Sequence, residues 1–233
     1  MLNRLTIAAA PLALSACVIV VDSGPHEADL ASDYVAQADR LPARSDLAAF
    51  TGVHAAAGTD VTVRGGEAFR IELDERAQER TVFEIEGGTL KVTCRKRGRA
   101  MGSCMRGDRG DAVVTMPEAD AFRVSSGAVL RVEKGVGLMD ELDIRASSGG
   151  DMRLADDLGT VASLTARASS GGSLDATGVT AARAEADASS GGSLRVHVTA
   201  QLEADASSGG SVSYEGNPEV ERSTSSGGSV RGR

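Results

Sequence analysis

The most frequent candidates for a chemical role in this chain are the serines of a repeated phrase. The phrase Ala-Ser-Ser-Gly-Gly-Ser-Leu begins at Ala168, and close variants begin at Ala146, Ala188, Ala206 and Thr224. A serine nucleophile needs a base within hydrogen-bond reach and a third group that orients this base. The three histidines lie in three different segments, at His26, His54 and His197. Because five near-identical phrases indicate one repeated structural role, we expect no catalytic serine and no enzyme.

Calcium binding is the second chemistry to consider for these phrases. Calcium-binding β-rolls repeat Gly-Gly-x-Gly-x-Asp every nine residues. Here Asp151 follows one Gly-Gly pair, but the later phrases have Ser at that position. Hydroxyl groups are poor ligands for Ca²⁺, which prefers carboxylate and carbonyl oxygens. We expect neither a metal nor a cofactor.

The first of the three cysteines points to export and anchoring. Residues 1–16 carry Arg4 near the start and then an apolar run that is too short to span a bilayer, as a secretory signal peptide does. The segment ends in Leu14-Ser15-Ala16-Cys17, which resembles the lipobox of bacterial lipoproteins. This resemblance implies lipidation of Cys17, and Val18 at the next position implies the outer membrane, on its periplasmic or surface side. The alternative is an ordinary signal peptide followed by a chance cysteine.

The other two cysteines are expected to form a disulfide. Three cysteines in an exported protein leave one without a partner. If Cys17 is acylated, Cys94 and Cys104 remain as a pair, and a disulfide persists in an oxidising compartment. A zinc site is not expected, because two cysteines without further Cys or nearby His cannot supply four ligands.

A cluster of cations lies within and just after the Cys94–Cys104 segment. Its members are Arg95, Lys96, Arg97, Arg99, Arg106 and Arg109. A local positive field of this kind attracts anions such as lipopolysaccharide phosphates or acidic glycans. The alternative is a solvated hairpin balanced by Asp108 and Asp111. Two Arg-Gly-Asp tripeptides in this segment match the integrin-recognition sequence, a match that arises easily by chance in a chain rich in these residues.

Composition limits both the core and the class of partner. Aromatic residues make up 3% of the 233 residues, so the core must consist of aliphatic side chains in thin layers. The formal net charge is −8, which argues against a general nucleic-acid binder, since such proteins need surplus Lys and Arg.

The chain divides into four segments. Residues 1–16 are the signal peptide, and residues 17–45 are the acylated Cys17 with a flexible tether that has no sustained hydrophobic period. Residues 46–118 show period-2 alternation interrupted by Gly-Gly and Pro, as strands joined by tight turns do. Residues 119–233 contain the repeats, and we expect them to continue the preceding strand region as one domain.

The repeat length predicts a solenoid. The first Ser of successive phrases is Ser125, Ser147, Ser169, Ser189, Ser207 and Ser225, with steps of 22, 22, 20, 18 and 18 residues. Self-similarity at this period is typical of solenoids, in which stacked coils bury a common core. No segment between phrases has a helical stripe. We therefore expect an all-β, right-handed parallel β-solenoid, the hand following from the crossover rule for parallel strands.

Alignment of the repeats on the phrase predicts which side chains face inward. Apolar residues alternate with polar ones on both sides of each phrase, so each phrase should be a corner between two strands. Glycine would allow positive φ at the corner, and the Ser hydroxyls would bond to the stack or to the local backbone. The inward columns before the corner are Phe122, Ile144, Ala166, Ala186, Ala204 and Arg222, then Val124, Ala146, Ala168, Ala188, Ala206 and Thr224; those after it begin with Leu130, Met152, Leu174, Leu194, Val212 and Val230.

The lipobox, the alternating strands that lead to Thr115-Met116-Pro117, and the serial Ser-Gly phrases together resemble the head GIN domain family, whose members are also called auto-transporter adhesins. The resemblance runs from Phe50 to Arg233. This chain has Ser-Ser-Gly-Gly where the family often has Ser-Gly-Ala-Ser, and we expect the fold to be unaffected. The resemblance implies a β-solenoid at the bacterial cell envelope without established catalytic residues.

These observations favour a non-enzymatic, lipid-anchored envelope protein whose solenoid is an adhesion, binding or scaffold surface for an envelope protein or a polysaccharide. The alternative is a carbohydrate-active enzyme, which would need paired acids or a basic residue in a groove. Outward residues that could line such a groove are Asp143, Glu185, Glu203 and Glu221 in one column and Arg131, Arg153 and Arg195 in another. Both a monomer and a dimer through the solenoid ends remain open.

Overall fold

The computed structural model describes residues 49–73, 77, 80–94 and 111–233. Within these residues the chain forms sixteen strands: β1 Gly52–Ala55, β2 Asp60–Gly65, β3 Arg70–Leu73, β4 Thr81–Glu86, β5 Thr89–Cys94, β6 Asp111–Met116, β7 Glu118–Val124, β8 Val129–Val132, β9 Gly137–Ala146, β10 Asp151–Leu154, β11 Gly159–Ala168, β12 Ser173–Ala188, β13 Ser193–Ala206, β14 Ser211–Glu215, β15 Glu219–Thr224 and β16 Ser229–Gly232.

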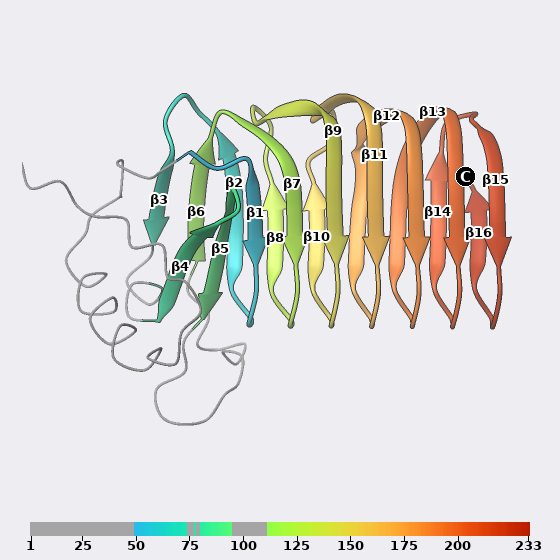
Figure 1. Cartoon of the computed structure of the whole chain (residues 1–233), viewed down its shortest axis with the longest axis horizontal. Helices are drawn as coiled ribbons and strands as arrows, with labels where there is room; N and C mark the ends of the chain where they lie inside the picture. The colour runs from blue at the N-terminus through green and yellow to red at the C-terminus, as the bar shows by residue number, and fades with distance from the viewer. Residues whose placement is uncertain (1–48, 74–76, 78–79, 95–110) are drawn as a thin grey trace, which may run out of the picture.

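The strands stack in two parallel columns that enclose the core (Figure 1). The first column runs β5, β1, β7, β9, β11, the second half of β12, the second half of β13, and β15. The second column runs β6, β2, β8, β10, the first halves of β12 and β13, β14 and β16. We call one strand of each column and the corner between them a rung. The predicted all-β parallel solenoid is confirmed.

The N-terminal end of the stack does not follow chain order. The β1–β2 rung lies between the β5–β6 rung and the β7–β8 rung. Strands β3 and β4 pair antiparallel with β6 and β5 and form the outermost strands at this end. Gly87 and Gly88 join a hairpin of β4 and β5, as the alternation predicts. The tight turn expected at Gly65-Gly66 does not pair β2 with β3, because β6 lies between them.

Each phrase forms the corner of a rung, and two of its residues have positive φ. The second Ser and the first Gly of the phrase beginning at Ala168 have φ of 49° and 72°, and the other phrases repeat these values closely. The N–H of Gly172 donates to the C=O of Ser169 at 2.8 Å, which closes the turn. Positive φ at both central residues is the mark of a type I′ turn. The sequence assigned this conformation to Gly alone, whereas Ser170 shares it.

Backbone groups connect each corner to the next. The N–H of Gly149 donates to the C=O of Ser170 at 3.1 Å, and the N–H of Ser169 donates to the C=O of Ala146 at 2.9 Å. The same two bonds recur between the later corners. The backbone therefore makes the stacking bonds that the sequence suggested for Ser hydroxyls; between stacked serines, a hydroxyl bond of 3.4 Å joins Ser229 to Ser211.

In the five phrases that have a second Gly, this residue lies close to the backbone of the neighbouring rung. The phrase at Ser125 has Ala128 at this position. A Cβ atom on Gly172 would lie 2.5 Å from the carbonyl oxygen of Ala146, and the equivalent glycines meet the same obstacle. A Cβ atom on Gly171 would meet nothing within 4 Å. The first Gly thus serves the turn and the second Gly serves the close approach of two backbones.

A further corner, which the sequence did not reveal, lies at residues 56–59 between β1 and β2. Ala57 and Gly58 have φ of 55° and 78°, and the N–H of Thr59 donates to the C=O of Ala56 at 3.3 Å. The letters Ala-Ala-Gly-Thr lack the Ser-Gly pattern, but the backbone is the same. The stack therefore contains one more rung of this geometry than the phrases show.

The inward columns are those predicted as far as Ala204 and Ala206, but Arg222 and Thr224, which the alignment placed next in these columns, are exposed on the outermost strand β15. Phe122 pairs in register with Ile144, which is followed on the next rungs by Ala166, Ala186 and Ala204. All of these residues are buried. Phe50, Phe83 and Phe122 lie at the N-terminal end of the core, whereas alanines line the first column from β11 onward. The core is therefore wide at one end and narrow at the other.

The two glycines of one corner provide a test of this packing. We expect Gly172→Ala to destabilise the fold by about 2–3 kcal/mol, because overpacking forces neighbouring backbones apart. Gly171→Ala has free space and costs about 1 kcal/mol from its positive φ alone. Urea unfolding of both variants measures the difference. Equal losses of stability would contradict the role given to the second Gly.

Candidate functional site

The outward side of the first strand column, which we call the first face, carries charged residues in register. Lys91, His54, Arg123, Arg145, Arg167, Asp187 and Asp205 follow one another along the stack, one per rung. A second line, two residues earlier in each strand, contains Asp143, Thr165, Glu185, Glu203 and Glu221. The first line changes from cations to anions between Arg167 and Asp187.

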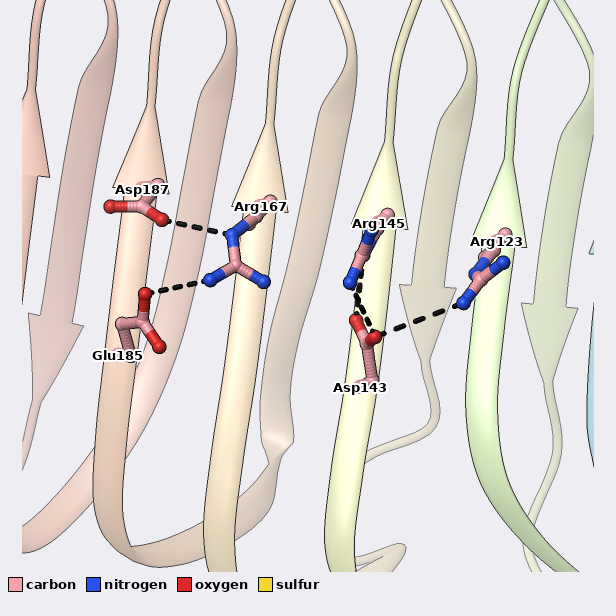
Figure 2. Close-up of polar contacts among 6 residues, drawn as sticks. All are labelled: Arg123, Asp143, Arg145, Arg167, Glu185 and Asp187. Carbon is pink, nitrogen blue, oxygen red and sulfur yellow. Dashed lines mark hydrogen bonds and ion pairs between the residues drawn. The ribbon is translucent and has the colours of Figure 1, made fainter.

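Arg167 joins two rungs at this change of sign. Its Nη2 atom donates to Glu185 Oε1 at 2.7 Å, and its Nε atom donates to Asp187 Oδ2 at 3.0 Å (Figure 2). The three side chains are 35–48% exposed, so each such pair contributes about 0.2–1 kcal/mol. Although burial opposes the charge on Arg167, the two carboxylates raise its pKa. This contact holds a fixed geometry more than it stabilises the fold.

Asp143 lies between two arginines on neighbouring rungs. It accepts two hydrogen bonds from Arg145 of its own strand, at 2.9 and 2.7 Å, and its Oδ2 atom is 3.9 Å from Nη2 of Arg123 (Figure 2). The Nε atom of Arg123 is buried and has no hydrogen-bond partner among the described residues. The charge of Arg145 is thus balanced by the carboxylate of Asp143, whereas the charge of Arg123 is balanced only weakly.

Acidic residues dominate the C-terminal half of the first face. In the part of the chain that the structure describes, Glu203, Asp205 and Glu221 are exposed, and no cation pairs with them. Adjacent rungs of a parallel sheet are about 4.8 Å apart, so these carboxylates lie close enough to repel one another. This half of the face carries a concentrated negative field.

The outward side of the second column, the second face, has its own line of cations. Arg131, Arg153, Asp175 and Arg195 are in register on successive rungs, which places an acid within the arginine column read from the sequence. A shallow depression beside them is lined by Asp151, Met152, Arg153, Ser173, Leu174, Asp175, Ser193 and Arg195.

Asp175 is held ionised in this depression. Partial burial opposes its charge, but hydrogen bonds from Thr177 and the guanidinium of Arg195, whose Nη1 lies 3.1 Å from Oδ2, keep its pKa below the usual value. Arg195 is thereby neutralised, and Arg153 lies 3.8 Å from Asp156. On the second face, therefore, Arg153 and Arg195 each lie beside a carboxylate of opposite charge.

One histidine contacts a corner serine. His54 Nε2 lies 3.0 Å from Ser125 Oγ, between β1 and the first corner phrase. Burial first, and then the charges of Lys91 and Arg123, lower the pKa of His54. A nucleophile also needs a group that orients its base. Within the described residues no carboxylate bonds to Nδ1 of His54, and this contact therefore lacks the third member of a triad.

Several predicted site residues lie outside the described residues. These are Cys17, Cys104 and the cations Arg95, Lys96, Arg97, Arg99, Arg106 and Arg109, together with both Arg-Gly-Asp tripeptides up to Gly110. Cys94 is the last residue of β5. The lipid anchor, the disulfide and the anion-binding loop therefore stay predictions.

Neither a metal-binding cluster nor a membrane-spanning helix is present among the described residues. No group of three or more His, Cys, Asp or Glu in these ranges is arranged to hold a metal ion. No helix among the same residues is long and apolar enough to cross a membrane.

Sequence analysis identified the column of Asp143, Glu185, Glu203 and Glu221 but missed the line through Arg123, Arg145 and Arg167. The missed line was visible in the alignment, two positions before the first Ser of each phrase. The contact between His54 and Ser125 left no such signal, since it depends on the out-of-order placement of β1 beside β7.

Comparisons with known proteins match this chain to one family model and to solved structures. The family model described as "Putative auto-transporter adhesin, head GIN domain" matches residues 49–218. A crystal structure of a "putative adhesin" from Bacteroides fragilis NCTC 9343 superposes with a TM-score of 0.58 at 14% identity, over 82% of this chain and 94% of that chain. Another "putative adhesin", from Parabacteroides distasonis ATCC 8503, gives a TM-score of 0.49 at 12% identity, over 82% and 95%. No curated protein matches the sequence.

His54 gives the stability of the fold a dependence on pH. Its pKa in the folded chain lies below the ordinary value of 6.5, so the unfolded chain takes up the proton first as pH falls. The contribution of neutral His54 to the free energy of unfolding is complete above pH 6.5. It is lost as the pH falls from 6.5 toward the pKa that His54 has in the folded chain. We expect His54→Gln to lose less stability than the wild type between pH 7.5 and pH 5.5, measured by urea unfolding. An identical loss in both proteins would contradict this assignment.

Proposed function

Because the chain belongs to the head GIN domain family of auto-transporter adhesins, we propose that it is a non-enzymatic binding protein of the cell envelope. Its solenoid acts as a rigid surface for adhesion. The partner is a macromolecule with a flat or extended shape, either another envelope protein or a polysaccharide.

The register of the outward side chains is the observation that carries this proposal. In the residues that precede each corner, the strands from β5 to β15 pair in register, and backbone hydrogen bonds fix the spacing between the rungs. A surface of this kind is pre-organised, so binding loses little conformational entropy. Stacked charges at a constant spacing suit a partner that also extends over many rungs.

A lipid on Cys17 anchors this surface to the outer membrane in our proposal. The lipobox-like Leu14-Ser15-Ala16-Cys17 supports the anchor, and residues 18–45 supply the tether. A flexible chain of this length has an end-to-end distance of about 30 Å. That distance allows the solenoid to turn either face toward a partner above the membrane.

The basic loop adds a second candidate contact. β5 ends at Cys94 and β6 begins at Asp111, so residues 95–110 connect these two strands along the chain. We propose that a disulfide between Cys94 and Cys104 restrains this loop and that its cations bind anionic groups. The strands that precede and follow it, β5 and β6, pair with the antiparallel strands β4 and β3 at one end of the stack.

The anchor and the binding surface are tested together in cells. We expect the wild type to incorporate labelled fatty acid and to sediment with outer membranes, and Cys17→Ser to do neither. Crosslinking in intact cells is then expected to recover a partner with the wild type. A wild type without label would contradict the anchor. A labelled wild type that crosslinks to no partner but turns over an acidic polysaccharide would favour a carbohydrate-active enzyme instead.

A further inference from the structure

A cluster of basic side chains crosses three neighbouring rungs of the first face. Lys91, His54 and Arg123 are in register on β5, β1 and β7, so they follow one another at about 4.8 Å. We propose that this basic cluster binds one acidic group of a polysaccharide and that His54 takes up a proton from the solvent when the group binds. The inference rests on the proposed binding function and names the chemistry of the partner.

The cations of the basic cluster are available to a ligand. Lys91 makes no ion pair within the described residues, and Arg123 makes only the contact of 3.9 Å with Asp143 (Figure 2). The Nε atom of Arg123 is buried and has no acceptor in the same part of the chain. Because an unsatisfied buried donor is costly, Arg123 loses little when its guanidinium turns from Asp143 toward an anion above β1. Lys91 and Arg123 are each one rung from His54, within reach of the same position.

Acidic residues lie around the basic cluster but not at its centre. The other charged residues on the adjoining strands are Glu84 and Glu86 of β4, Asp120 of β7, and Asp143 and Arg145 of β9. Glu84 pairs in register with Lys91 on the side away from β1, and Asp143 accepts two hydrogen bonds from Arg145. Asp120 accepts a hydrogen bond from Thr51, which precedes β1. The space above His54 is therefore one strand from two cations, whereas Glu84 and Asp143 are two strands away.

The residues beside the basic cluster leave room for a sugar chain. On the same three rungs the second line of the first face consists of Thr89, Gly52 and Ala121. All three are short and uncharged, so a chain can pass over them for about 10 Å with its acidic group toward the cations. Asp143 ends this uncharged strip on the next rung. A site one residue wide fits a single polymer chain better than a membrane, whose charges spread over a plane.

His54 connects binding with pH. In the free protein, burial first and then the charges of Lys91 and Arg123 lower the pKa of His54. An acidic group between these cations favours the charged imidazole, so binding raises the pKa of His54. Ser125 Oγ lies 3.0 Å from Nε2 and can accept a hydrogen bond from the charged ring. The complex then holds more protons than the separate partners, and the affinity increases as the pH falls from 7.5 to 5.5.

Titration calorimetry of the full-length acylated protein in nonionic detergent tests the site, with oligogalacturonate of defined length as the probe. The carboxylates of this probe have a pKa of about 4 and stay ionised at pH 5.5. We expect Lys91→Gln/Arg123→Gln to weaken binding about tenfold, because both cations beside the acidic group are lost. If this variant melts early, Lys91→Gln alone replaces it, with a loss of about threefold.

A matched variant controls for the change in net charge. Arg222→Gln/Arg231→Gln removes the same charge from exposed positions on β15 and β16, many rungs from β1. Binding should stay within about twofold of wild type, because salt screens charges at that distance.

Proton uptake gives a readout that a purely structural role of His54 would not move. Titrations at pH 6.5 in two buffers with different heats of ionisation count the protons taken up. We expect a fraction of one proton for the wild type and for His197→Gln on the second face, and none for His54→Gln. The wild type should also bind about threefold more tightly at pH 5.5 than at pH 7.5.

The outcomes separate this site from the proposed function. A wild type that does not bind the probe, binds it equally well after Lys91→Gln/Arg123→Gln, or takes up no proton would overturn the site. Free galacturonate that binds as tightly as the oligomer would overturn the assignment to a polysaccharide. The proposed function fails separately, if crosslinking in cells recovers no partner or if the probe is shortened during the titration.

Discussion

The close approach of consecutive corners is the constraint on which the rest of the structure depends. Each corner has two residues with positive φ, and from the corner beginning at Ser147 onward these are followed by a glycine that lies against the carbonyl group of the preceding rung. Thr59 and Ala128 occupy this position in the two earlier corners. A Cβ atom on any of these glycines would lie within 3 Å of that carbonyl group, so the two backbones would have to shift apart. Backbone bonds such as the one from Gly149 to Ser170 then fix the spacing, and every inward and outward column follows from it.

The fixed spacing connects the fold with its surface chemistry. Because equivalent residues lie directly above one another, a single substitution pattern along the repeats becomes a line of charge. Where the line changes sign, Arg167 bridges two rungs, and where an acid lies beside two arginines, Asp143 neutralises one of them. The ends of the first face keep their charges. The line through Arg123, Arg145 and Arg167 therefore continues as Asp187 and Asp205 on the following rungs.

The structure could be predicted from the sequence mainly where the repeats can be aligned with one another. Phase-aligned phrases were enough to predict the inward columns at Ile144, Met152 and Leu174, since six copies average out local ambiguity. The corner at Ala57-Gly58 and the contact of His54 with Ser125 escaped, because β1 and β2 precede the repeats and lie out of chain order. The sharing of positive φ by Ser170 also escaped, since propensity alone assigns that conformation to glycine.

The distance between the first and last phrases tests the central claim of stacked corners most directly. Spin labels on non-natural amino acids at Ser126 and Ser226 leave the cysteines untouched, and both positions are exposed. Five steps between rungs of about 4.8 Å each predict a backbone separation of about 24 Å between the two labelled corners. The label distances should form one narrow distribution around this value. A broad distribution, or a mean beyond about 40 Å after allowance for the labels, would contradict a continuous stack of rungs at that spacing.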